Sequence, residues 1–284
     1  MVNMEDTSGN MKICSFDIDN LVGFDSLWQE VQARSTIPSE FEPQVFDQHI
    51  NQLYMRGISQ SLEAPPSQEI IDIEFQTENP MAYYCNHYPE PSRDFLSPAN
   101  GMIRLRKFMN APEERDELAN IASNIFQAPV KTRGHFLYPP GGFKEWHTNY
   151  NHDQGWRMYI IDVDKDNESY FRYIDPDTGE MKTLWDKKGT VNFFHVDRDK
   201  PIWHCIKSES AYRFSRGFLV PDNWRDFIKL KSDTNAEVAS PVMNIQPTNE
   251  LRALRQQVSE LKKENAVLKQ AIAVLSKDYL DKAD

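Results

Sequence analysis

The sequence lacks the features of membrane-spanning and secreted proteins. No apolar run approaches the ~18 to 20 residues of a transmembrane helix, and residues 1–6 have neither the basic nor the apolar part of a signal peptide. The three cysteines, Cys14, Cys85 and Cys205, are an odd number without C-x-x-C spacing, which argues against a disulfide framework and a thiolate zinc site. We therefore expect a soluble, cytoplasmic protein with reduced cysteines.

An excess of basic residues is also absent. The 32 Lys and Arg residues are outnumbered by 43 Asp and Glu residues, which gives a formal net charge of −11. This balance argues against nucleic acid or an anionic membrane as the main partner, although it leaves room for a local basic groove. The length of 284 residues and the aromatic content of 12% instead indicate a folded chain with a sizeable core.

Residues 1–99 predict a helical or irregular region that covers a larger domain. Apolar residues recur at helical spacing from about Asp19 to Arg34 and, more regularly, from Glu42 to Tyr54. The part after Ala64 is rich in proline, acidic and amide residues around one apolar run at residues 70–75. A strand is our interpretation of that run.

Residues 100–228 predict the main domain, which is mainly β with flanking helices (α+β). A strand-like run begins at Gly101, and a helix follows that starts with the capping pattern of Asn110 and Pro112 and ends before Pro129. The period of the apolar residues then changes to two. Short strands are predicted at about residues 133–138, 156–163, 169–174, 180–185, 190–196, 201–207 and 212–220. Since no helix between them is long enough for a crossover, we predict an antiparallel sandwich or barrel, with a jelly roll as the obvious member.

The C-terminal part of the sequence predicts a linker followed by a dimerisation helix. Residues 229–248 lose periodicity, and heptads then run through residues 249–284. One core position holds Leu251, Val258, Asn265, Ile272 and Tyr279, and the other holds Leu254, Leu261, Leu268 and Leu275. This pattern favours a parallel two-stranded coiled coil, so we predict a homodimer through residues 249–280. The alternative is a helix that folds back onto its own domain.

His147, Asn149 and His204 are the candidate metal-ligating and catalytic residues. In an extended strand, residues i and i+2 point to the same face, so His147 and Asn149 would approach one metal ion together. His204 lies on a later predicted strand that antiparallel pairing can bring close. Arg213 and Ser215 repeat the i, i+2 spacing on the next strand, where a guanidinium and a hydroxyl that face one way suit a ligand carboxylate.

This order of residues, preceded by a Y-P-P-G-G turn that starts at Tyr138, resembles the non-haem iron, 2-oxoglutarate-dependent oxygenase family, particularly its prolyl-4-hydroxylase-like branch. The resemblance implies a double-stranded β-helix (jelly roll) core. It also implies Fe(II) bound by His147 and His204, with 2-oxoglutarate as cosubstrate. Arg213 and Ser215 would hold the distal carboxylate of 2-oxoglutarate, and Tyr138 would add a hydrogen bond. The implied reaction is oxidation of a C–H bond in a substrate that the sequence does not identify.

The resemblance covers roughly residues 100–222 and has one departure, because the family's carboxylate ligand is Asn149 here. Asparagine keeps an oxygen donor but removes one negative charge from the facial triad, so metal affinity should fall. Three interpretations remain open. Asn149 ligates or lies beside a working iron; Asp153 supplies the carboxylate; or the chain is a non-catalytic jelly-roll binding or scaffold module dimerised by its coiled coil. The resemblance also implies that Arg157 and Tyr159, on the strand after His147, line the interior.

Overall fold

The computed structural model of the chain describes residues 13–55, 62–76, 96–97, 100–105, 112–150 and 152–231. The predicted linker after residue 231, the predicted coiled coil at residues 249–284 and Cys85 lie outside these residues. Cys14 and Cys205 are buried free thiols, as expected. None of the described helices is both long and apolar enough to span a membrane.

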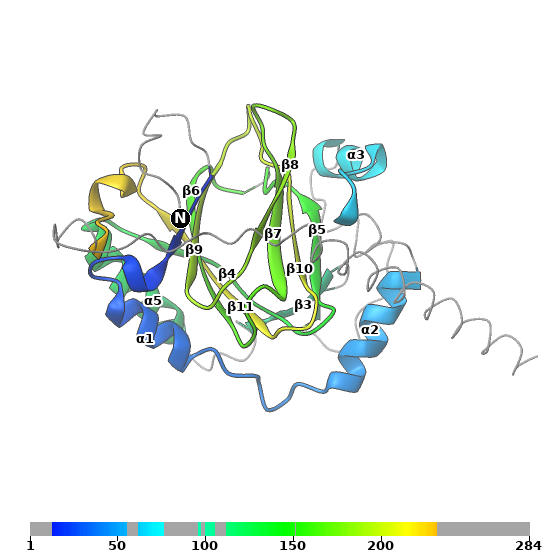
Figure 1. Cartoon of the computed structure of the whole chain (residues 1–284), viewed down its shortest axis with the longest axis horizontal. Helices are drawn as coiled ribbons and strands as arrows, with labels where there is room; N and C mark the ends of the chain where they lie inside the picture. The colour runs from blue at the N-terminus through cyan, green and yellow to red at the C-terminus, as the bar shows by residue number, and fades with distance from the viewer. Residues whose placement is uncertain are drawn as a thin grey trace, which may run out of the picture. The chain divides into compact units, whose positions relative to one another are not determined.

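A mainly antiparallel β-sheet forms the core (Figure 1). Its strands are β1 (Ile13–Asp17), β2 (Leu96–Ser97), β3 (Asn100–Arg104), β4 (Lys131–Tyr138), β5 (Phe143–His147), β6 (Gly155–Val163), β7 (Ser169–Ile174), β8 (Met181–Trp185), β9 (Thr190–Val196), β10 (His204–Ser208) and β11 (Arg213–Val220). They are hydrogen-bonded in the order β1-β9-β6-β11-β4-β3-β5-β10-β7-β8, with β2 paired to β3. Segment 1–99 therefore contributes an edge strand, β1, as well as helices.

The sheet has two halves, which enclose a common interior. The first half is β1-β9-β6-β11-β4, the second is β5-β10-β7-β8, and β3 connects them. Tyr138 on β4 and Phe194 on β9 belong to the first half, whereas Phe171 on β7 and Ile206 on β10 belong to the second, yet all four pack in one buried cluster. Side chains alternate between this interior and the outer faces because the period of a strand is two. The interior, rather than an outer face, therefore receives the side chains of the candidate site.

Helices cover the outer faces of both halves. They are α1 (Asp25–Ala33), α2 (Pro43–Met55), α3 (Gln68–Gln76) and α5 (Pro112–Phe126), with short 3₁₀ helices η1 (Ile18–Asn20) and η4 (Trp224–Phe227). Leu27 of α1 and Leu118 of α5 pack with Phe193 and Phe218 of the first half, while Phe46 of α2 packs near β3 and β5. Figure 1 shows α1 and α5 on one side of the sheet and α2 and α3 on the other. The prediction of an antiparallel β core with flanking helices is confirmed.

Most predicted elements are present, but the interpretation of residues 70–75 as a strand is wrong. They lie in helix α3, whose first turn is capped by the Ser67 hydroxyl, which accepts a hydrogen bond from the Ile70 N–H at 3.3 Å. Ile70 and Ile73 are buried while Phe75 is exposed, which is the spacing of a helix face. A short continuous apolar run is compatible with either element, and the N-cap decides between them. Strands β1, β2 and β5 have no counterpart among the predicted strands.

Candidate functional site

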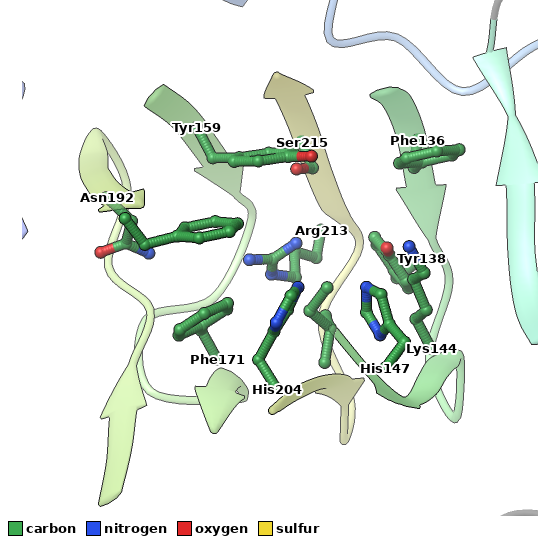
Figure 2. A pocket seen from close by; sticks show the side chains of 12 residues that line it. Phe136, Tyr138, Lys144, His147, Tyr159, Phe171, Asn192, His204, Arg213 and Ser215 are labelled. Atoms are coloured by element: carbon green, nitrogen blue, oxygen red, sulfur yellow. The ribbon is translucent and has the colours of Figure 1, made fainter. Parts of the chain in front are cut away.

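His147 and His204 lie side by side on neighbouring strands. The antiparallel pairing of β5 with β10 places His204 directly opposite His147, and the centroids of the two imidazole rings are 4.1 Å apart. His204 is buried and His147 is partly buried. Figure 2 shows both rings in the same pocket. The structure thus brings together two histidines that are far apart in sequence.

Both imidazoles are held in the form that leaves Nε2 as the acceptor nitrogen. Nδ1 of His147 donates to the Glu145 carbonyl at 2.7 Å, and Nδ1 of His204 donates to the Ile202 carbonyl at 2.8 Å. A carbonyl oxygen can only accept, so the proton lies on Nδ1 in each ring. Burial lowers the pKa of His204 to about 3, and burial together with the nearby Lys144 charge holds the pKa of His147 well below its usual value. Two neutral imidazoles therefore present Nε2 lone pairs, as metal ligation requires.

Asn149 reaches this pair through a turn, not along the strand as the i, i+2 spacing suggested. Strand β5 ends at His147, and Asn149 has φ 60°, in the left-handed region that asparagine tolerates. Its side-chain Nδ2 lies 3.1 Å from Nε2 of His204 and donates to it. Asp153, the alternative carboxylate, forms an ion pair with Arg133, and its side chain is 62% exposed. The structure therefore places Asn149 beside the two histidines, whereas the Asp153 carboxylate is paired with Arg133.

Helix α3 supports the turn that carries Asn149. Glu74 accepts hydrogen bonds from both the backbone N–H of Thr148, at 2.7 Å, and the Thr148 hydroxyl. Both side chains are buried. Thr148, between His147 and Asn149, is thus fixed by the buried carboxylate of Glu74. The sequence analysis did not single out Glu74, because it interpreted residues 70–75 as a strand.

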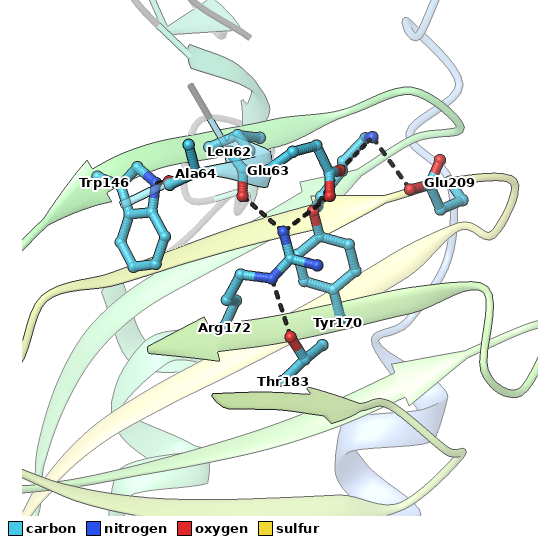
Figure 3. A network of polar contacts seen from close by, with 9 residues as sticks. Leu62, Glu63, Ala64, Trp146, Tyr170, Arg172, Thr183 and Glu209 are labelled. Carbon is cyan, nitrogen blue, oxygen red and sulfur yellow. Dashed lines mark hydrogen bonds and ion pairs between the residues drawn. The ribbon is translucent and has the colours of Figure 1, made fainter. Parts of the chain in front are cut away.

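The segment before α3 is fastened to the outer face of the second half-sheet (Figure 3). Arg172 Nη1 donates to the Leu62 carbonyl at 2.6 Å and forms an ion pair with Glu63 at 3.0 Å. Trp146 Nε1 donates to the Ala64 carbonyl at 2.9 Å. Since Trp146 precedes His147 directly, these bonds hold the strand of the first histidine and helix α3 together.

Arg213 lies on β11 opposite Tyr138 of β4 and is fixed by a carboxylate. Its Nε donates to Asp186 Oδ2 at 2.7 Å, and the same oxygen accepts the Ser169 hydroxyl at 2.8 Å. Only 1% of Arg213 and 0% of Asp186 is exposed. Arg213 Nη1 is buried without a hydrogen-bond partner. The sequence analysis predicted Arg213 but did not single out Asp186.

A cavity with about 370 Å³ of unfilled space, including its open mouth, joins these groups. It is lined by Phe136, Tyr138, Lys144, His147, Tyr159, Phe171, Asn192, Phe194, His204, Ile206, Arg213 and Ser215 (Figure 2). The predicted residues Tyr138, His147, His204, Arg213 and Ser215 therefore face one space. Asn149 contacts His204 without lining the cavity wall.

Two polar residues of the wall, Lys144 and Asn192, were not predicted. Asn192 is 1% exposed, and neither its amide nitrogen nor its amide oxygen has a hydrogen-bond partner. Burial lowers the pKa of Lys144 to about 8, although the Glu74 carboxylate acts in the opposite direction. Neither residue belongs to a recognisable motif, so only the fold reveals them. Each supplies a polar group that a bound ligand can satisfy.

The donor set fits a divalent transition metal in ligand type, with one negative charge fewer than two histidines and a carboxylate provide. Among the described residues, no group of three or more His, Cys, Asp or Glu side chains is arranged to hold a metal ion. The ligands available are Nε2 of His147, Nε2 of His204 and the amide of Asn149, whose oxygen can replace its nitrogen by rotation about the last side-chain bond. The unpartnered Nη1 of Arg213 likewise fits a carboxylate of 2-oxoglutarate.

Neither a family model nor a curated protein matches the chain. Among solved structures, it is similar to a 2OG-Fe(II) oxygenase family oxidoreductase from Burkholderia pseudomallei, with 13% identity, a TM-score of 0.30, and coverage of 39% of this chain and 56% of that one. A prolyl-4-hydroxylase from Pseudomonas putida has 16% identity and a TM-score of 0.28, with 37% and 60% covered. A prolyl hydroxylase from Trichoplax adhaerens, in complex with a hypoxia inducible factor peptide fragment, has 12% identity and a TM-score of 0.38, with 76% and 86% covered. The chain thus spans less than two thirds of the first two proteins, and all three likenesses are distant.

Proposed function

We propose that the chain is an Fe(II)- and 2-oxoglutarate-dependent dioxygenase that hydroxylates its substrate. The observation that carries the proposal is the shared cavity of His147, His204 and Arg213. Two neutral imidazoles present Nε2 to it, and a fixed guanidinium presents an unpartnered Nη1 to the same space. One group of donors suits a metal ion and the other suits a carboxylate, which are the two requirements of this chemistry.

In the proposed site, His147, His204 and Asn149 hold Fe(II), which when bound supplies the oxygen activation coupled to 2-oxoglutarate decarboxylation. Backbone carbonyls fix the two rings, so little side-chain entropy is lost when the ion binds. Phe171 and Phe194 pack against His204 with ring centroids 5.3 Å and 4.9 Å away. These rings exclude water from the nitrogen donors.

Arg213 is proposed to bind the distal carboxylate of 2-oxoglutarate through Nη1, with Ser215 on the same face of β11 as a second donor. Tyr138 lies across from Arg213, whose guanidinium carbon is 5.3 Å from the Tyr138 ring centroid. Burial raises the pKa of Tyr138, so its hydroxyl remains a donor at neutral pH. The carboxylate would thus meet three donors on two adjacent strands.

The charge of the site makes metal retention depend on the cosubstrate. With Asn149 in place of a carboxylate, the protein ligands to the ion are all neutral. Dianionic 2-oxoglutarate then supplies the negative charge that the protein does not. Fe(II) is therefore expected to bind more tightly when 2-oxoglutarate is present.

A second candidate function is a non-catalytic jelly-roll module that binds a carboxylate ligand. The observation that favours it is the hydrogen bond of 3.1 Å from Asn149 Nδ2 to Nε2 of His204, because this bond occupies the lone pair that a metal ion needs. The Arg213 end of the cavity is unaffected by that bond.

Succinate formation from 2-oxoglutarate by the full-length chain, with Fe(II) in air, distinguishes the proposed enzyme from the non-catalytic binding module. The enzyme is supported if the parent turns over and His204→Ala abolishes turnover, while His195→Gln, on the outer side of β9 against Trp156, retains it. The binding module is supported if the parent is inactive and Asn149→Asp gains activity, since that change restores the missing charge.

A further inference from the structure

We propose that Glu74 is a positioning residue of the candidate metal site, which holds the Asn149 side chain beside His204 through Thr148. Glu74 lies in α3, on the outside of the sheet, and is 9% exposed. Neither Glu74 nor Thr148 lines the cavity, so both act on a ligand only through other residues. The effect on a metal ion rests on the proposed function, whereas the effect on the contact between Asn149 and His204 does not.

One carboxylate oxygen fixes the backbone on both sides of Asn149. Glu74 Oε1 accepts a hydrogen bond from the Thr148 N–H at 2.7 Å and another from the Thr148 hydroxyl. The same hydroxyl oxygen accepts a hydrogen bond from the Tyr150 N–H at 3.1 Å. Thr148 and Tyr150 are therefore both linked to one buried carboxylate, and Asn149 lies between them.

The turn at Asn149 needs such support. Strand β5 ends at His147, so the backbone pairing of β5 with β10 does not extend to Thr148. Asn149 follows with φ 60°, a left-handed conformation that costs energy in residues with a Cβ, although asparagine tolerates it. Glu74 supplies the acceptor for the Thr148 N–H that the strand no longer provides, and so keeps the chain in this conformation.

The direction of the side chains explains how a residue outside the sheet acts on the cavity. Along an extended chain, successive side chains point to opposite faces. His147 lines the cavity, whereas Thr148 points outward to α3, where Glu74 meets it. The turn then brings the Asn149 side chain back to His204, with Nδ2 3.1 Å from Nε2. A movement of Thr148 therefore displaces Asn149 from His204.

The next residue of α3 contacts the chain beside two of the candidate ligands. The Phe75 ring packs edge-to-face against Tyr150 and Trp203, with ring centroids 5.2 Å and 5.6 Å apart. These two residues are the direct neighbours of Asn149 and His204. Because Phe75 is 40% exposed, its ring contacts lie at the surface, and the buried carboxylate of the preceding residue makes the stronger contact.

Removal of the Glu74 carboxylate leaves two donors of Thr148 without their acceptor. A hydrogen bond to a charged acceptor is about twice as strong as a neutral one, and a buried donor without an acceptor keeps its full desolvation cost. The turn should then rearrange, and Asn149 should leave His204. Glu74→Gln keeps an acceptor oxygen and loses only the charge, whereas Glu74→Ala loses both. The two variants therefore separate the position of the turn from the charge.

The test is the NMR chemical shift of the Nε2 nitrogen of His204 in the full-length chain without metal. This nitrogen accepts a hydrogen bond in the parent, and Asn149→Gly, which suits the left-handed backbone, gives the shift without that bond. We expect Glu74→Ala to move the shift to the Asn149→Gly value and Glu74→Gln to keep the parent value. The matched control Glu69→Ala, at an exposed carboxylate of the same helix, should also keep the parent value.

A second pair of variants tests the same link from the other side, should Glu74→Ala fail to fold. Thr148→Val keeps the shape of the side chain but lacks the hydroxyl that joins Glu74 to the Tyr150 N–H. It should move the His204 shift toward the Asn149→Gly value, whereas Thr148→Ser, which retains the hydroxyl, should not.

Calorimetric titration with Co(II) gives the second readout. Loss of a group that orients a metal ligand typically weakens metal binding about 10-fold or more, and we expect this loss in Glu74→Ala. Binding of 2-oxoglutarate to the metal-free chain depends on Arg213 and should not change. Equal weakening of both would indicate a general structural role and would overturn the proposal.

The proposal is also overturned if the parent and Asn149→Gly have the same His204 shift, or if folded Glu74→Ala and Thr148→Val keep the parent shift. A Glu74→Gln shift as large as that of Glu74→Ala would show that charge, not position, matters. Failure of the parent to bind Co(II) would refute the proposed metal site, but a His204 shift that follows Glu74 would leave the positioning role intact.

Discussion

Asp186 fixes the Arg213 guanidinium through a 2.7 Å hydrogen bond, which Arg213 Nε donates to Asp186 Oδ2. Asp186 accepts from Nε and, at 3.5 Å, from Nη2 of Arg213, while Nη1 is buried without a hydrogen-bond partner among the described residues. Asp186 is itself held by the Ser169 hydroxyl at 2.8 Å. Asp186 is therefore a positioning residue, which acts on a ligand only through Arg213.

Asp186→Asn is predicted to weaken 2-oxoglutarate binding and to destabilise the fold. Removal of one partner leaves a buried, uncompensated arginine, which typically costs about 3 to 5 kcal/mol. Calorimetric titration with 2-oxoglutarate, at a temperature where urea unfolding shows the variant to be folded, measures both effects. Asp199→Asn, at an exposed aspartate, is the control. An unchanged affinity in folded Asp186→Asn would show that Arg213 does not depend on this carboxylate.

The two histidines predict a loss of stability as the pH falls. The pKa of His204 is lowered from 6.5 to about 3, so between those values the unfolded chain binds a proton that the folded chain does not. The free energy of unfolding should therefore fall with decreasing pH, by up to about 1.4 kcal/mol per pH unit from this residue. Urea unfolding of the parent and His204→Gln from pH 7 to pH 4 measures the difference. Equal slopes in the two proteins would contradict a buried, neutral His204.

Lys144 predicts a trend of the same sign at high pH, where the free energy of unfolding should rise as the pH rises from 8 to 10.5. Its pKa is lowered from 10.5 to about 8, so the charged form is disfavoured in the folded chain below pH 8, and this cost disappears as the pH rises to 10.5. Lys144→Met should therefore raise the free energy of unfolding at pH 7, by roughly 3 kcal/mol at most, and by less as the pH rises. Lys131→Met, at an exposed lysine, should give no such gain. A destabilised Lys144→Met would show that the ammonium makes favourable contacts instead.

The heptads of residues 249–280 predict a parallel homodimer, although they lie outside the described residues. Sedimentation should give the full chain twice the 33.1 kDa mass of one copy, and a chain that ends near Val242 should sediment as a monomer. If both proteins are monomeric, the helix folds back or pairs with another protein.

The part of the site that could be predicted depends on strand periodicity. The i, i+2 relation of Arg213 and Ser215 places both on one face whatever the register, and antiparallel pairing brings His204 to His147. Asp186 and Asn192 could not be found in this way, because their roles come from contacts between strands that are distant in sequence. Helix α3 was missed because its apolar run is too short for its period to be recognised. Because α3 was not predicted, the hydrogen bonds between Glu74 and Thr148 could not be predicted either.

Anaerobic titration of the full-length chain with Fe(II), in the presence and absence of 2-oxoglutarate, tests the central claim most directly. The account predicts one equivalent of Fe(II) per chain, bound more tightly with 2-oxoglutarate, lost in His204→Ala and strengthened in Asn149→Asp by the added charge. Binding that is absent in the parent with 2-oxoglutarate, or that is the same in His204→Ala, would contradict an iron site at His147 and His204.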